Sequence, residues 1–122
     1  MGFCLGGRIT YLLATGIAEF KAAVPFYPAG VWTAWGDGLT AFERTSGISC
    51  PVLGLFGLED ENPSPDDVEK LDAEFTRLNI EHDFHSYQAG HDFQNFSAAR
   101  YNEAAAKESW PVAMDFLHAH LV

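Results

Sequence analysis

The stretch MGFCLGG, residues 1–7, places one cysteine in a G-x-C-x-G-G frame directly before a helical pattern. This frame is that of a nucleophile elbow, a sharp turn from strand to helix, with sulfur in place of the usual serine oxygen. Gly2 and Gly6 are expected to leave room where a side chain would collide with neighbouring backbone. Cys4 would then lie at the apex of the turn, where the positive end of the helix dipole favours the thiolate. The alternative is an ordinary glycine-rich helix start, and the rest of the chain has to decide between the two.

The strand that normally anchors such an elbow has no room in this sequence. Only Met1 precedes Gly2, so we expect no strand to lead into the turn within these residues.

Composition limits the class of protein. The 122 residues suffice for one domain, residues 1–122, and 48% of them are apolar, as in a globular protein. The formal net charge of −10 repels nucleic acid and anionic lipid, so neither is an expected partner. No apolar run approaches the ~20 residues that span a bilayer.

The two cysteines lie in different settings, Cys4 in the elbow frame and Cys50 before a buried-looking strand. A disulfide between them is therefore not expected. The sequence shows no signal peptide, which favours a reducing cytoplasm in which Cys4 stays free.

Hydrophobic periodicity predicts helices and strands in alternation. The expected helices are 5–18, a short one near 40–44, one beginning at Pro65 after the N-cap Ser64, and 103–120. The expected strands are 20–27, 51–56 and 81–87. The first helix carries a stripe of Ile9, Leu12, Leu13 and Ile17. The helix at Pro65 has acids, Asp66 and Asp67, in its first turn and one apolar face of Val68, Leu71, Phe75 and Leu78. Asn102 can cap the last helix, which places Ala105, Trp110, Ala113, Phe116 and Leu117 inward.

Pro25 lies inside the first expected strand. Because proline cannot donate to a neighbouring strand, this residue indicates an edge position.

Alternating strands and helices indicate a parallel sheet, whose ligands gather at the carboxyl ends of the strands. Three loops reach that edge with, in chain order, Cys4, Asp60 and His91. The order nucleophile, acid, histidine is that of the α/β-hydrolases. A histidine can take the thiol proton, and a carboxylate can orient its ring and stabilise its charged form.

Each of these residues has a simpler interpretation. Asp60 could only bind solvent, and His91 could be a surface histidine like His82 or His85. A metal site formed by the three histidines is disfavoured, because a strand places His82 and His85 on opposite faces.

The chain resembles the carboxyl-terminal half of dienelactone hydrolase family proteins, which have the α/β-hydrolase fold. The matching stretches are GFCLGGR at 2–8, CPVLGLFGLEDENPSPDDV at 50–68, FHSYQAGHDFQN at 84–95, RYNEAAAKESW at 100–110 and FLHAHL at 116–121.

The resemblance implies that Cys4 is the nucleophile, Asp60 the acid and His91 the base, with the backbone N–H of Leu5 as one oxyanion donor. It also implies that the family's amino-terminal half, with the second oxyanion donor and the carboxylate that acts on the resting cysteine, lies outside this sequence. Members specific for dienelactone carry arginine where this chain has Asn95, so dienelactone itself is not the expected substrate.

The sequence therefore predicts a three-layer α/β fold, a short parallel sheet of about three strands with helices on both faces, as a truncated α/β-hydrolase. One expected function is hydrolysis of a small-molecule ester or lactone through a thioester, without cofactor or metal. The other is a catalytically inactive remnant that acts as an association or binding module. In both cases the missing elbow strand leaves the edge of strand 20–27 unpaired. We therefore expect a homo-oligomer, with a dimer as the first guess.

Overall fold

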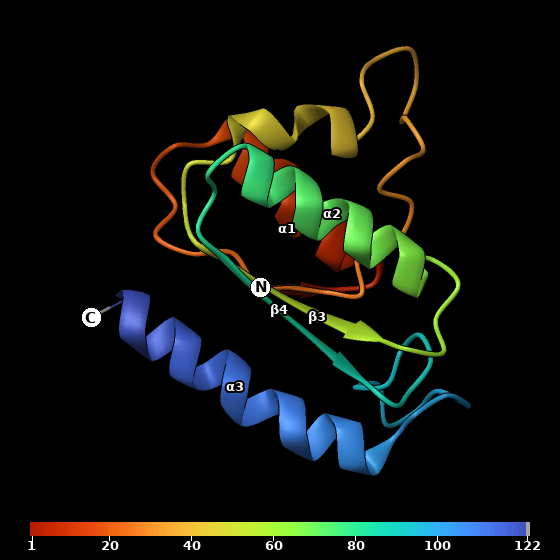
Figure 1. Ribbon diagram of the computed structural model, residues 1–122. Helices are drawn as coiled ribbons and strands as arrows, with labels where there is room; N and C mark the ends of the chain where they lie inside the picture. Colours follow the sequence, from red (N-terminus) through yellow and green to blue (C-terminus); the bar gives the residue numbers. More distant parts are fainter. Residues whose placement is uncertain (122) are drawn as a thin grey trace.

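The computed structural model describes residues 1–121. Its elements are β1 (Gly2–Phe3), α1 (Leu5–Gly16), β2 (Pro25–Phe26), the 3-10 helix η1 (Phe42–Gly47), β3 (Val52–Gly57), α2 (Pro65–Arg77), β4 (His82–Tyr87) and α3 (Glu103–Leu121). The strands form one parallel sheet in the order β1-β2-β3-β4. Figure 1 shows α1 and α2 over one face of the sheet and α3 over the other. The predicted three-layer α/β arrangement is confirmed.

The sheet has four strands where about three were expected, and the expectation that no strand leads into the elbow was wrong. The additional strand is β1, which is the strand leading into the elbow. The amide of Gly2 donates to the Val24 carbonyl at 3.1 Å, and the amide of Cys4 donates to that of Phe26 at 3.1 Å. Two residues are therefore enough to dock the turn on β2, although they are too few to show a pattern in the sequence.

Strand β2 is shorter than expected and is not an edge strand. It covers Pro25–Phe26 of the predicted 20–27, with an isolated bridge from Ala23 to Val52, and it lies between β1 and β3. The missing amide hydrogen of Pro25 is tolerated because residues on both sides of it bond to the β3 segment. Ala23 donates to Pro51 at 3.0 Å and Tyr27 donates to Leu55 at 2.8 Å.

Strand β3 is buried along its whole length and divides the core in two. Val52 and Phe56 belong to the cluster on the side of α1 and α2, whereas Leu53 and Leu55 belong to the cluster on the side of α3. This alternation follows from the two-residue period of a strand, and it explains why the segment is apolar without interruption.

Helix α2 begins as its sequence predicts. The hydroxyl oxygen of Ser64 accepts from the Asp67 amide at 3.2 Å, and the Asp67 carboxylate accepts from the Ser64 amide at 3.0 Å. This capping box and Pro65 at the first position fix the start of the helix. Leu71 and Phe75 are buried beneath it, so the predicted apolar face is confirmed.

Helix α1 directs its apolar stripe toward solvent, unlike a typical amphipathic helix. Ile9, Leu13 and Ile17, three members of its apolar stripe, are 42%, 44% and 39% exposed. The side of α1 that faces the protein instead buries Arg8 and Tyr11. The periodicity predicted the helix correctly, but the apolar stripe does not face the core of this chain.

Arg8 holds the loop that follows β2 against α1. Its guanidinium donates to the carbonyl of Gly30 at 2.6 Å and to that of Thr33, and it lies 4.0 Å from the centre of the Trp35 ring. A buried cation needs such partners, since an unpaired one is costly.

Helix α3 covers the second face of the sheet. The side-chain oxygen of Asn102 accepts from the Ala105 amide at 3.0 Å, which confirms the predicted cap. Ala113 is buried as expected, but Trp110 is 42% exposed and the inward position predicted for it was wrong. Within residues 1–121, no helix combines the length and the apolar character needed to cross a membrane.

Candidate active site

Cys4 lies at the tip of the turn between β1 and α1, in a conformation that L-residues rarely adopt. Its φ and ψ are 54° and −115°. The surrounding backbone holds it there: its carbonyl accepts from the amides of Arg8 at 3.0 Å and Ala29 at 3.3 Å. A strained residue of this kind costs on the order of 1–3 kcal/mol and persists only where neighbouring structure fixes it. The structure thus has the elbow geometry that the sequence predicts.

The glycines around Cys4 do not all serve the purpose expected of them. A Cβ on Gly2 would lie 2.2 Å from the Gly6 carbonyl oxygen, so Gly2 is required for space. A Cβ on Gly6 itself would meet nothing within 4 Å outside its own turn, and the prediction for Gly6 was wrong. The second required glycine is Gly7, where a Cβ would lie 2.5 Å from the Phe26 carbonyl oxygen. This glycine lets α1 approach β2.

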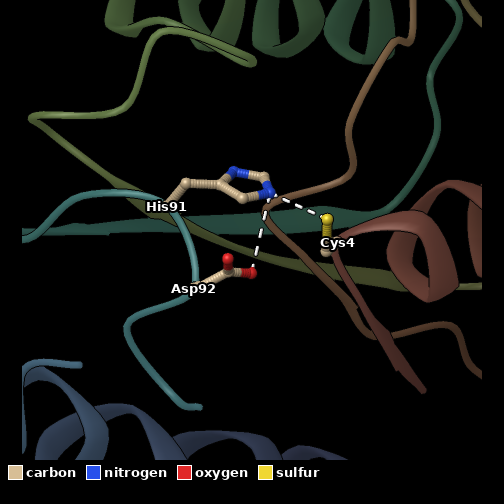
Figure 2. A group of neighbouring side chains, drawn as sticks. All are labelled: Cys4, His91 and Asp92. Atoms are coloured by element: carbon tan, nitrogen blue, oxygen red, sulfur yellow. Dashed lines mark hydrogen bonds and ion pairs between the residues drawn. The ribbon is translucent and has the colours of Figure 1, made fainter. Parts of the chain in front are cut away.

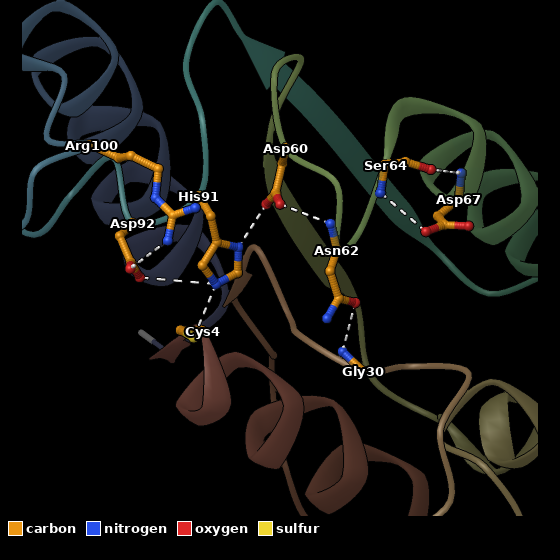
Figure 3. Close-up of polar contacts among 9 residues, drawn as sticks. All are labelled: Cys4, Gly30, Asp60, Asn62, Ser64, Asp67, His91, Asp92 and Arg100. Atoms are coloured by element: carbon orange, nitrogen blue, oxygen red, sulfur yellow. Dashed lines mark hydrogen bonds and ion pairs between the residues drawn. The ribbon is translucent and has the colours of Figure 1, made fainter.

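His91 and Asp60 come from the loops after β4 and β3, two neighbouring parallel strands. The Nδ1 atom of His91 lies 2.7 Å from the Oδ2 atom of Asp60, which confirms the predicted contact. The Nε2 atom lies 2.9 Å from the Sγ atom of Cys4. Figure 3 shows the three side chains in series, although 87 residues separate Cys4 from His91. All three predicted residues therefore meet at one edge of the sheet.

The loop after β3 fixes the Asp60 carboxylate. Asp60 is only 6% exposed. Its Oδ1 atom accepts from the Asn62 amide at 2.9 Å, while the Asn62 side chain accepts from the Gly30 amide at 2.9 Å (Figure 3). The acidic residue is thus tied to the loop after β2 as well as to its own.

The contacts of His91 change its basicity. The hydrogen bond that Nδ1 donates to Asp60 raises the pKa of His91 to about 9, against the opposing effect of burial, and the contact with Cys4 adds to the rise. A carboxylate can only accept, so Nδ1 carries a hydrogen toward Asp60. Nε2 is then the atom that exchanges a proton with the sulfur.

Asp92 is a site residue that the sequence reasoning missed. Its Oδ1 atom lies 3.9 Å from Nε2 of His91, and its Oδ2 atom lies 3.7 Å from Nη2 of Arg100. Asp92 has a φ of 62°. Its position next to His91 was the available signal, but the direction of its side chain depends on this left-handed backbone.

Cys4, His91 and Asp92 also bring three possible metal ligands together. Their ligand atoms all lie within 4.8 Å of one another (Figure 2). Sulfur, imidazole nitrogen and carboxylate oxygen are ligand types that Zn²⁺ accepts. The strand histidines do not join them, because His82 contacts Asp72 and His85 contacts Asp83.

Two cavities flank the Cys4 and His91 pair. The one that Cys4 faces has a volume of about 400 Å³, and its lining residues are Phe3, Cys4, Tyr27, Asp92, Gln94, Asn95, Phe96 and Trp110. The other, of about 370 Å³, lies beside Asp60 and His91 and is lined further by Glu59, Glu61, Asn62 and Arg100. Four of the eight residues that line the first cavity are aromatic, whereas charged and polar residues line the second, so an apolar group has a place next to the sulfur.

The amide of Leu5, predicted as an oxyanion donor, belongs to the first residue of α1. The first amides of a helix have no acceptor within the helix. This one directly follows Cys4, at the positive end of the helix dipole.

A parallel sheet covered on both faces, with an elbow at its carboxyl edge, defines an α/β-hydrolase fold. Solved structures agree: an acylaminoacyl peptidase of Pyrococcus horikoshii has a TM-score of 0.81 over 98% of this chain, at 18% identity, which concerns the fold alone. The family model described as "Dienelactone hydrolase family" matches residues 1–121, and the chain belongs to this family.

Several relatives share more sequence. The chain is 34% identical over 111 residues to the "Putative carboxymethylenebutenolidase" of Salmonella typhimurium, a match that covers 89% of this chain and 41% of that protein. The crystal structure titled "Putative Dienelactone Hydrolase" from Klebsiella pneumoniae is similar with a TM-score of 0.86 and 32% identity, covering 93% of this chain and 48% of that one. The chain thus spans less than half the length of these relatives.

Proposed function

We propose that this chain carries the catalytic residues of a hydrolase that acts on ester or lactone bonds. Cys4 is the nucleophile, His91 the general base and acid, and Asp60 the residue that orients His91. The observation that carries the proposal is the series of contacts at 2.9 Å and 2.7 Å that joins Cys4, His91 and Asp60 from three separate loops. Membership of the dienelactone hydrolase family supports the ester or lactone as the substrate class.

The proposed reaction has two steps. In the first, the proton of Cys4 has passed to Nε2 of His91, whose raised pKa favours the charged ring, and Sγ bonds to the substrate carbonyl carbon. The bond from that carbon to the leaving oxygen then breaks, and His91 returns the proton to the departing alcohol. In the second, His91 takes a proton from water, the resulting hydroxide attacks the thioester, and the acid leaves as Cys4 regains its thiol. The Leu5 amide is the proposed donor to the oxyanion in both steps.

A burst assay with p-nitrophenyl acetate tests the proposal. The expected result is a rapid release of about one nitrophenolate per chain, with an acetyl group on the Cys4 peptide by mass spectrometry. Cys4→Ala and His91→Ala should lack the burst. Cys50→Ser is the matched control and should keep it, since Cys50 is buried and burial raises the pKa of its thiol. Acetylation of Cys50 in place of Cys4 would refute the proposed nucleophile.

A second candidate function is association without catalysis, and one observation favours it. Beside β1 lies a groove of about 390 Å³ formed by Met1, Ile9, Leu13 and Phe20 with small residues between them. Exposed apolar surface of this kind marks sites of interaction. In this candidate, two copies associate through α1 and β1 as a closed homodimer, the commonest symmetric arrangement. A dimer in sedimentation without a burst would favour this function over the first.

The proposed thiol chemistry also favours a compartment. Both Cys4 and Cys50 are free, and a catalytic thiol has to stay reduced. A reducing cytoplasm fits this requirement. Oxidation of Cys4 in material isolated from cells, detected by differential alkylation, would contradict it.

A further inference from the structure

The side chain of Asp92 faces the reacting atoms of the candidate site. Its backbone is held in the left-handed conformation, and its carbonyl accepts from the Asn95 amide at 2.9 Å. The carboxylate lies 3.9 Å from Nε2 of His91 and within 4.8 Å of Sγ of Cys4 (Figure 2). A group bound to the sulfur therefore lies close to a negative charge.

The charges around Cys4 do little to compensate Asp92. Arg100 lies 3.7 Å from the Oδ2 atom, and its side chain is 65% exposed. A pair this exposed is strongly screened by solvent. His91 already has a counterion in Asp60 at 2.7 Å. Among the described residues, those that line the cavity at Cys4 include no lysine or arginine.

The second cavity carries negative charge, as Asp92 does in the first. Glu59, Asp60 and Glu61 line it together with Arg100. An anionic substrate that approaches Cys4 from either side therefore meets carboxylates, whereas the walls offered by Phe3, Tyr27 and Trp110 in the first cavity carry no formal charge.

We propose that Asp92 is a specificity residue that restricts Cys4 to uncharged substrates, namely esters or lactones whose acyl part is apolar and bears no carboxylate. The inference rests on the proposed function and names its substrate class. Two like charges about 5 Å apart at a partly solvated site repel enough to lower a reaction rate by about tenfold. The aromatic residues Phe3, Tyr27 and Trp110 of the first cavity then bind the apolar acyl part of an uncharged substrate.

Alkylation of Cys4 tests the inference without requiring any hydrolysis. Iodoacetamide and iodoacetate differ chiefly in charge, and with both of them the sulfur displaces iodide as a C–S bond replaces the C–I bond. The quantity to measure is the ratio of the two rate constants at the Cys4 peptide, divided by the same ratio for free glutathione in the same buffer. The expected ratio favours iodoacetamide in the native protein.

Three variants make the test specific. Asp92→Asn should lower the normalised ratio by about tenfold, and asparagine accepts the left-handed backbone as readily as aspartate does. Arg100→Gln should raise the ratio only slightly, because solvent already screens the exposed Arg100 cation beside Asp92. Asp115→Asn removes the same charge at an exposed position far along α3 and should leave the ratio unchanged. A circular dichroism spectrum and melting curve for each variant verify the fold.

Two results would overturn the inference: a native protein that prefers iodoacetate, or a ratio that Asp92→Asn leaves unchanged in a folded protein. A burst assay with paired esters, one uncharged and one with a terminal carboxylate, separates the two proposals. Equal bursts with both esters would refute the role of Asp92 and leave the hydrolase intact. No burst with either ester, together with a charge-selective alkylation, would refute the hydrolase and leave the role of Asp92 at Cys4 supported.

Discussion

The carboxyl edge of the sheet and the outer face of α1 meet at the turn of Cys4, yet the side chains of the edge bond to one another and those of the outer face have few contacts. At the edge, Cys4, His91 and Asp60 bond in series although they come from three loops. On the outer face, Ile9 and Leu13 are each more than two-fifths exposed. Contacts within the chain therefore determine the first region, whereas the second presents apolar surface that the described residues leave uncovered. Substitutions at the carboxyl edge should therefore change the rate of the proposed reaction, and those on the outer face of α1 should change the proposed association between copies.

The largest effect is expected for Asp60→Asn at the edge. Asparagine cannot act as the carboxylate acceptor that holds Nδ1 of His91 protonated, so kcat/KM for an activated ester should fall by about 10³–10⁴. Steady-state kinetics measure it. Glu59→Gln is the matched control, since Glu59 accepts from Gln88 and does not contact His91. A loss of less than tenfold for Asp60→Asn would show that Asp60 does not act together with His91 and Cys4 in the reaction.

A pair of leucine truncations compares the core with the outer face. Leu71 on α2 is 1% exposed and Leu13 on α1 is 44% exposed. Leu71→Ala should lower the free energy of unfolding by about 2–5 kcal/mol, whereas Leu13→Ala in the monomer should lower it by less than about 1 kcal/mol. Urea denaturation at low protein concentration measures both. Equal losses would mean that the outer face is as buried in solution as the core.

The pH dependence of stability should report the contact between His91 and Asp60. The pKa of His91 is raised to about 9 in the folded protein from 6.5. The folded state thus binds the proton more tightly, and the stability gained is complete below pH 6.5 and lost as the pH rises through 9. We expect the free energy of unfolding to fall by at most about 3 kcal/mol across this window. His91→Gln should flatten the profile, and a native profile that is already flat would contradict the charged contact.

The smallest effect concerns the outer face itself. Leu13→Glu would place a charge in the groove beside β1 and should raise the dissociation constant of the proposed dimer by about tenfold or more. Sedimentation over a concentration series measures this. Thr76→Glu, which adds the same charge to an exposed position of α2, should change nothing. A native protein that stays monomeric at micromolar concentration would refute the dimer.

The sequence was most informative where local chemistry decides the structure. Ser64, Pro65 and Asp67 predicted the start of α2, and the loops after β3 and β4 predicted the meeting of Asp60 with His91. Each of these predictions depends on the geometry of one cap or of two neighbouring strands. The catalytic roles remain predictions until activity is measured.

The sequence was least informative where the outcome depends on which neighbour an element has. The stripe on α1 shows that a helix has an apolar side, but not that the core lies on the other side, against Tyr11. Strand β1 is too short to show a period, and its existence depends on hydrogen bonds to Val24 and Phe26. The position of Asp92 depends on a left-handed residue that no composition rule locates.

The space around the elbow also limits how its sequence can vary. Gly2 and Gly7 have backbone atoms of other residues within 2.5 Å of the place where a Cβ would go, whereas Gly6 has none within 4 Å outside its own turn. Substitution by alanine should therefore be acceptable at Gly6 and damaging at the other two. Of the three glycines in the G-x-C-x-G-G frame, only the first and the last are steric requirements here. A chain with alanine in the middle place could keep the same turn, and one with a side chain at the first place could not.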